Sequence, residues 1–265
     1  MMPGNLFQLE LAAALGDRRR LALRIGISIL LALPFIFVAM PTRARVSGVT
    51  MVVLFTSFFG AAVHHARLRA DGRLARLCLL PMRRGVLWLD LVLASMLSRL
   101  APALVVVFCF VLVNGRRLSG VALAGVAGLL CAALLALTLL GIVVGRLARS
   151  NGEVHLLGAL AAGAVALASG VMPLPERLTW MTGVTAWNPV AGLLDALNAL
   201  AAGRPSPGGG QLGLAMLVLV LVAATAGQRW IAGHCRLAPA DGRAAAANEV
   251  SPRTELRSPK PPLEA

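Results

Sequence analysis

Residues 66–90 read ARLRADGRLARLCLLPMRRGVLWLD and lie between two segments apolar enough to cross a membrane. Within this stretch Leu74, Leu77 and Leu80 recur at three-residue spacing, and arginines stand between them. Leucines at this spacing share one face of a helix, and a proline disfavours helical backbone in the residue before it. We therefore expect a short, basic, amphipathic helix that ends before Pro81 and lies at a membrane surface.

The composition is that of a membrane protein. Hydrophobic residues make up 58% of the chain and charged residues 14%, and the mean hydropathy is +0.81. A soluble domain is about half apolar and about a quarter charged. The formal net charge of +14 falls mostly in the segments between apolar runs, so we expect the lipid bilayer, and no nucleic acid, as a partner.

Six apolar segments predict an all-α bundle of six transmembrane helices. They are residues 25–40, 47–65, 91–113, 121–145, 155–172 and 211–230. Residues 4–16 mix apolar side chains with Gln8 and Glu10, which favours an interfacial helix; an ordinary start of the first span is the alternative. We expect no signal-peptide cleavage, a single transmembrane domain over residues 1–235 and a disordered tail over 236–265.

The distribution of basic residues predicts the orientation. With the N-terminus inside, residues 1–24, 66–90, 146–154 and 229–265 hold 18 of the 25 lysines and arginines, and the outer segments hold 6. Positive charge is enriched in cytoplasmic loops. This bias predicts that both termini are cytoplasmic.

Residues 169–197 differ from an ordinary loop because prolines interrupt two short apolar segments. This pattern predicts a re-entrant hairpin at the outer face, with indole rings at the interface; a helix lying outside on the surface is the alternative. The residues that define the predicted hairpin are Pro173, Pro175, Trp180, Trp187, Asn188 and Pro189.

Small residues recur at four-residue spacing in the fourth and fifth spans. The pairs are Gly141 with Gly145, and Ala159 with Gly163. Such pairs let helices approach closely. We expect packing within the chain rather than a dimer face.

The six predicted spans contain no aspartate or glutamate. Proton- or sodium-driven carriers use an ionisable group near the bilayer midplane, so the energy source is expected elsewhere. The single lysine, Lys260, lies in the tail, which excludes a Gly-x-x-x-x-Gly-Lys phosphate loop. We expect no catalytic residue, no metal site and no cofactor on this chain; the cysteines and the His64-His65 pair lack ligand spacing.

Arg99 is the charged residue in the interior of a predicted span, whereas Arg229 stands at the end of the sixth. Ser95 precedes it by one turn on the same face, whereas Asp90 lies about 180° round the helix and is no partner. We expect Arg99 to face the bundle interior, either in a structural ion pair or in contact with substrate.

The layout resembles the membrane subunit of type-2 ABC transporters. The resemblance covers residues 4–232 and rests on the N-terminal interfacial helix, on the segment after the second span, and on the Gly170-x-Met172-Pro173…Trp187-Asn188-Pro189 segment. In the second of these, the residues similar to the family's coupling helix are Arg69, Asp71, Gly72, Arg73, Leu74, Arg76, Leu77 and Pro81.

The resemblance implies a permease in the bacterial cytoplasmic (inner) membrane that works with a separate ATPase subunit. ATP and Mg would bind that partner, whose closure would push on the coupling segment. A second permease subunit, identical or a sister chain, would complete a pathway lined by the first, second and fifth spans. The absence of tyrosine and the 5% aromatic content favour a hydrophobic drug, lipid or peptide-like substrate.

Three alternatives stay open on the sequence. A polysaccharide-exporting ABC permease shares the layout. A proton-coupled secondary carrier would transport without an ATPase. A membrane-embedded enzyme or an assembly scaffold is the third; an enzyme would need a nucleophile or metal cluster at membrane depth, and the sequence shows neither.

Overall fold

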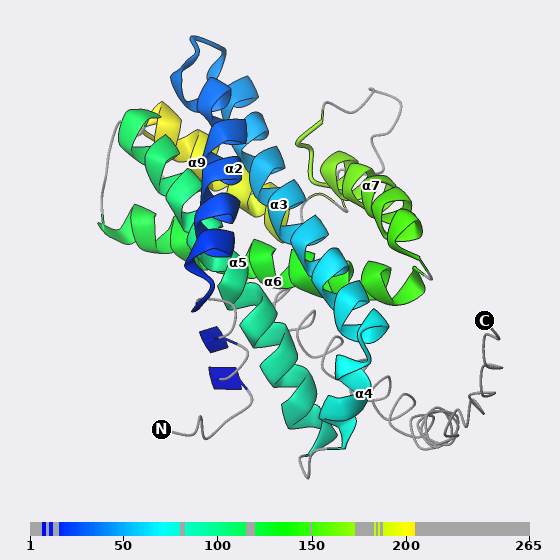
Figure 1. Cartoon of the computed structure of the whole chain (residues 1–265). Coiled ribbons are helices and arrows are strands. Elements are labelled where there is room, and N and C mark those ends of the chain that lie inside the picture. Colours follow the sequence, from blue (N-terminus) through cyan, green and yellow to red (C-terminus); the bar gives the residue numbers. More distant parts are fainter. Residues whose placement is uncertain are drawn as a thin grey trace, which may run out of the picture.

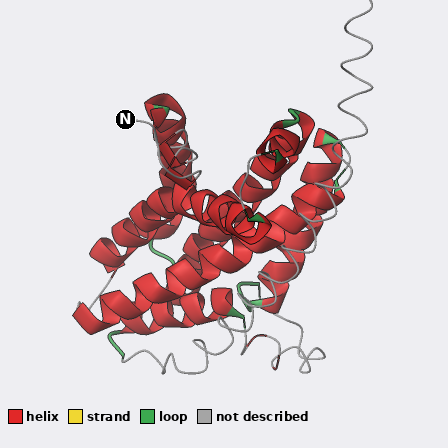
Figure 2. Cartoon of the chain, turned by 90° about the horizontal axis from the view of Figure 1, so that it is seen from below, coloured by secondary structure: helices red, strands yellow, loops and turns green. Residues whose placement is uncertain are grey.

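The computed structural model describes residues 7, 8, 11, 12, 16–79, 83–114, 120–148, 150–172, 183, 185 and 188–204. Helices joined by short turns make up this part of the chain (Figures 1 and 2). The helices are α2 (Arg18–Phe37), α3 (Thr42–Ala70), α4 (Arg73–Cys78), α5 (Arg84–Asn114), α6 (Gly120–Leu147), α7 (Asn151–Ala168) and α9 (Pro189–Ala202).

Helix α3 is the centre of the bundle. It packs against α2, α5, α6, α7 and α9, most extensively against α6 (Figure 1). Leu54 and Phe58, on the buried face of α3, are fully enclosed. The remaining helices are thus held together largely through their contacts with α3.

Within the residues that the structure describes, three helices are long and apolar enough to cross a membrane: α3, α5 and α6, with 29, 31 and 28 residues. Shorter apolar stretches occupy Leu21–Phe37, Gly152–Ala168 and Pro189–Ala202. Large apolar side chains face outward on α2 and α7, where Leu30 is 66% and Leu160 75% exposed. An exposed apolar surface of this kind fits contact with lipid.

Helices α3 and α5 are longer than the second and third spans predicted within them. Helix α3 continues to Ala70 instead of ending at His65, and α5 begins at Arg84 instead of Leu91. Arginine and leucine are good helix formers, and a 29-residue helix of about 43 Å exceeds an apolar core of about 30 Å. Residues 66–70 and 84–90 therefore extend two long helices rather than belonging to a loop.

A two-residue turn, Asp71-Gly72, separates α3 from α4. Gly72 has a φ of 65°, a left-handed conformation that a residue without a Cβ adopts readily. In α4 the Leu74 side chain is buried in a small apolar cluster with Leu68 of α3 and Leu87 of α5. The predicted amphipathic helix is thus present as α4; Leu80 and Pro81 lie outside the described residues.

Glycines on α6 allow it to touch the backbone of α3. A Cβ added at Gly141 would lie 2.7 Å from the Phe58 carbonyl oxygen, and one at Gly145 would lie 2.5 Å from the Ala62 carbonyl oxygen. The expected close packing within the chain is therefore found at this pair. A Cβ at Gly163 on α7 would meet nothing within 4 Å.

Several predicted features fall outside the part of the chain that the structure describes. They are most of residues 4–16, the sixth span at 211–230, the tail at 236–265, and Pro173, Pro175, Trp180 and Trp187. The Asn188-Pro189 pair is described and forms the start of α9. The Asn188 side chain accepts a hydrogen bond from the Val190 backbone N–H at 3.0 Å, and Pro189 occupies the first turn.

Candidate functional site

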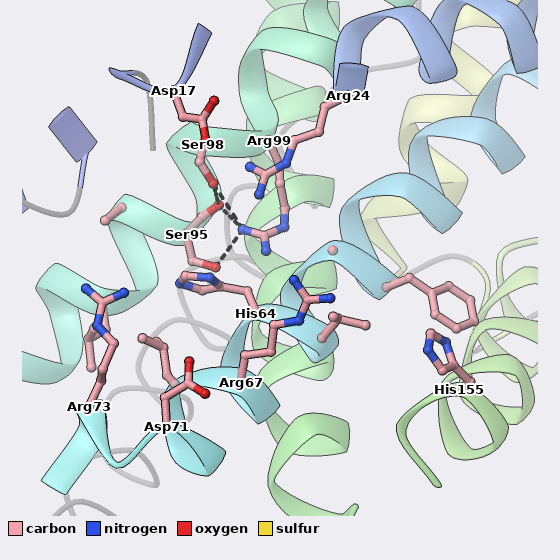
Figure 3. Close-up of a pocket in the computed structure, with 16 residues that line it drawn as sticks. Asp17, Arg24, His64, Arg67, Asp71, Arg73, Ser95, Ser98, Arg99 and His155 are labelled. Carbon is pink, nitrogen blue, oxygen red and sulfur yellow. Dashed lines mark hydrogen bonds between the residues drawn. The ribbon is translucent and has the colours of Figure 1, made fainter. Parts of the chain in front are cut away.

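A pocket of about 600 Å³ lies where α2, α3, α4, α5 and α7 come together (Figure 3). Its walls combine the residue before α2, the second half of α3, the turn into α4 and the middle of α5. The charged, histidine and serine residues that line it are Asp17, Arg24, His64, Arg67, Asp71, Arg73, Ser95, Ser98, Arg99 and His155.

Arg99 forms the inner wall of the pocket and is only 5% exposed. Its Nη1 donates to the Ser95 hydroxyl oxygen at 2.7 Å, to the Ser98 hydroxyl oxygen at 3.2 Å and to the Ser95 carbonyl oxygen (Figure 3). The Nε atom is buried without a hydrogen-bond partner. Serine oxygens, rather than a carboxylate, hold this cation in the described part of the chain, so the ion pair that the sequence favoured is not found there.

Gly60 of α3 faces Arg99 across the pocket. A Cβ at this position would lie 3.0 Å from the Arg99 Nε atom. A larger residue would therefore press on the guanidinium, so glycine leaves room for the Arg99 Nε atom beside α3.

Three further arginines line the pocket: Arg24 from α2, Arg67 from α3 and Arg73 from α4. In Figure 3 the side chains of Arg24 and Arg67 extend toward the region occupied by Arg99. Arg24 lies close enough to Arg99 for their positive charges to repel each other. Since Asp17 and Asp71 are the acidic lining residues, the pocket carries an excess of positive charge even with its histidines neutral.

The residues assigned to the coupling segment occupy different positions. Arg73 lines the pocket, and Leu74 is buried. Leu77 is half-buried, and Arg76 is exposed. Arg69 contacts α6: its guanidinium donates to the Arg146 carbonyl oxygen at 2.5 Å and to the Ala148 carbonyl oxygen. The segment is therefore attached both to the pocket and to the end of α6.

The sequence places Arg99 and Ser95 on one face of a helix, but no local pattern places Arg24, His64 and Arg67 beside them. Arg24 and Arg67 belong to the basic segments that predict the orientation, and the His64-His65 pair lacks ligand spacing. One signal was available: an arginine at membrane depth needs polar neighbours, and basic residues at the adjoining ends of α2 and α3 are the nearest source.

A comparison with protein families matches residues 5–201 to the ABC-2 type transporter family. The chain belongs to this family. The match spans all the helices from α2 to α7 and most of α9, so the pocket and α4 lie within the ABC-2 region. No curated protein matches the sequence closely enough to serve as a relative.

Membership of the ABC-2 family makes this chain a membrane transport component, and its apolar helices make it a multi-pass membrane protein. The resemblance inferred from residues 4–232 is thus confirmed. The family is that of the membrane part of the transporter, which works with an ATPase subunit.

Proposed function

We propose that this chain is the membrane-spanning subunit of an ATP-driven exporter, with six transmembrane helices, both termini in the cytoplasm and a location in the bacterial cytoplasmic membrane. A second permease subunit and two ATPase subunits complete the working unit. Residues 1–235 form its one transmembrane domain. The ABC-2 match over residues 5–201 is the observation that carries this proposal.

Helix α4 is the surface on which the ATPase pushes. Its length of six residues, its buried Leu74 and its exposed Arg76 support that role, because one face is anchored by Leu74 while Arg76 is exposed. The turn at Gly72 lets α4 leave the axis of α3. Movement of α4 would pass into α5 through the apolar cluster around Leu74 and Leu87.

The orientation follows from the position of the basic residues. Arg67 and Arg69 end α3, Arg83 and Arg84 precede or begin α5, and Arg146 ends α6. Positive charge is retained on the cytoplasmic side. The end of the bundle that carries α4 is therefore the cytoplasmic end in this proposal.

The test is a charge reversal on α4. In the double variant Arg73→Glu, Arg76→Glu, we expect the ATPase subunit to be lost from the purified complex, or to hydrolyse ATP without driving transport, while insertion is unchanged. The matched control is Arg43→Glu with Arg204→Glu, two exposed arginines that the topology puts outside. Coupled transport equal to wild type in the α4 variant contradicts the coupling role.

A further inference from the structure

In the pocket beside α3, arginines outnumber acidic residues among the lining side chains that the structure describes. Within this described set, four arginines and two aspartates leave two positive charges in excess when His64 and His155 are neutral. Gathering like charges costs free energy unless an anion compensates them. A pocket with this lining selects a ligand of opposite charge.

Arg99 gives the pocket its most specific feature. At 5% exposure it is deeply buried, and its Nη1 is already occupied by Ser95 and Ser98. Among the described residues its Nε–H has no hydrogen-bond acceptor, and this buried atom lies against Gly60 at the wall of the pocket. A buried donor without an acceptor costs about 1–3 kcal/mol, so a ligand oxygen placed here is stabilised.

Serine hydroxyls orient this arginine without neutralising it. The Ser98 hydroxyl donates to the Ser95 carbonyl oxygen at 2.8 Å, which leaves its oxygen lone pairs toward the Arg99 Nη1 atom. The guanidinium is therefore fixed in the pocket while its charge stays available. A fixed guanidinium whose Nε–H has no acceptor among the described residues is suited to oxyanion recognition.

We infer that the pocket formed by Arg24, Arg67 and Arg99 binds a phosphate-type oxyanion. A phosphate or pyrophosphate group can carry more than one negative charge and offers several acceptor oxygens, which matches several guanidinium groups; a single carboxylate offers one charge and two oxygens. Assigning this anion to the transported molecule rests on the proposed function, whereas binding itself does not.

Two kinds of molecule could supply the phosphate-type oxyanion. It is either the head group of an anionic amphiphile, whose chains would lie against the apolar part of the wall at Phe59, Val63 and Leu91, or a water-soluble phosphate compound. If the ligand is an amphiphile, the expected hydrophobic substrate is one that carries an anionic phosphate group.

Binding is measured on the purified full chain in a nonionic detergent, with no ATPase present. The probes are dioctanoyl phosphatidic acid, dioctanoylglycerol, which has the same chains without phosphate, and inorganic pyrophosphate. The variants are Arg24→Gln, Arg67→Gln, Arg99→Gln and Gly60→Ala; Arg83→Gln is the matched control, since Arg83 is exposed and outside the pocket.

We expect phosphatidic acid to bind at least about tenfold more tightly than dioctanoylglycerol, and each arginine variant of the pocket to lose about tenfold or more, because a hydrogen bond to a charged group is lost. Gly60→Ala weakens binding in the same direction, and Arg83→Gln stays within about twofold of wild type. Pyrophosphate binding as tightly as phosphatidic acid identifies a soluble source; binding about tenfold more weakly identifies an amphiphile.

Equal affinity for phosphatidic acid and dioctanoylglycerol together with no pyrophosphate binding overturns the inference. Wild-type affinity in the arginine variants of the pocket overturns it as well. Arg24 and Arg67 are exposed, so their variants decide the question if Arg99→Gln does not fold. An ATPase that fails to co-purify would contradict the proposed function and leave this binding result standing.

Discussion

The Arg69 guanidinium on α3 donates a hydrogen bond to the backbone carbonyl oxygen of Ala148, immediately after α6. It donates a second one to the Arg146 carbonyl oxygen at 2.5 Å. The last carbonyls of a helix have no partner within that helix, and here a side chain from a distant segment satisfies them. The end of α3, three residues before Gly72, is thereby tied to the end of α6.

Removing this arginine should loosen the two helix ends. We expect Arg69→Ala to lower the free energy of unfolding by about 1–2 kcal/mol, because two charge-assisted hydrogen bonds are lost. Arg69→Lys recovers only part of this, since an ammonium cannot present the two-pronged edge of a guanidinium. Thermal unfolding in detergent measures the stability of both variants, with Arg83→Ala as the control. Equal stability of Arg69→Ala and Arg83→Ala would contradict a stabilising contact between the ends of α3 and α6.

Gly141 on α6 should tolerate no side chain. In Gly141→Ala the new Cβ meets the Phe58 carbonyl oxygen at 2.7 Å, a backbone atom that cannot move aside alone, so α6 and α3 must separate. We expect a loss of about 1–3 kcal/mol in unfolding free energy. Gly128→Ala on the same helix is the control because its Cβ meets nothing within 4 Å.

That control should be neutral or slightly stabilising, since alanine is the better helix former by up to about 1 kcal/mol. Unfolding curves recorded under identical detergent conditions compare the two variants directly. If both behave alike, the close approach of α3 and α6 at Gly141 is not the packing of the folded protein.

The helices could be predicted from the sequence because apolar runs and arginine-rich ends are local patterns. Their lengths could not, because the point where α3 stops depends on the left-handed turn at Gly72 and on the burial of Leu74 against Leu87. The same limit applies to the pocket. Arg24 and Arg99 are far apart in the chain, and only the packing of α2 on α5 brings both to one cavity.

The side-chain oxygen of Asn188 should stabilise the start of α9. Asn188→Ala removes the acceptor for the Val190 backbone N–H and should cost about 1 kcal/mol of stability, whereas Asn188→Asp retains the cap. Thermal unfolding tests this difference. We also predict that the Asn188-Pro189 pair of the expected outer hairpin acts as a gate, so that Asn188→Ala with Pro189→Ala lowers transport more than it lowers the amount of protein in the membrane; wild-type efflux in this variant argues against gating.

The central claim is that a separate ATPase drives this chain, and isolation of the complex from the native host tests it most directly. The full chain is tagged at its C-terminus, extracted in a mild detergent, and the co-purifying proteins are identified and their amounts compared. The account predicts a stoichiometric ATPase subunit that carries its own Gly-x-x-x-x-Gly-Lys phosphate loop. A homogeneous chain without such a subunit, whose transport collapses with an uncoupler, would contradict it and favour a proton-coupled carrier.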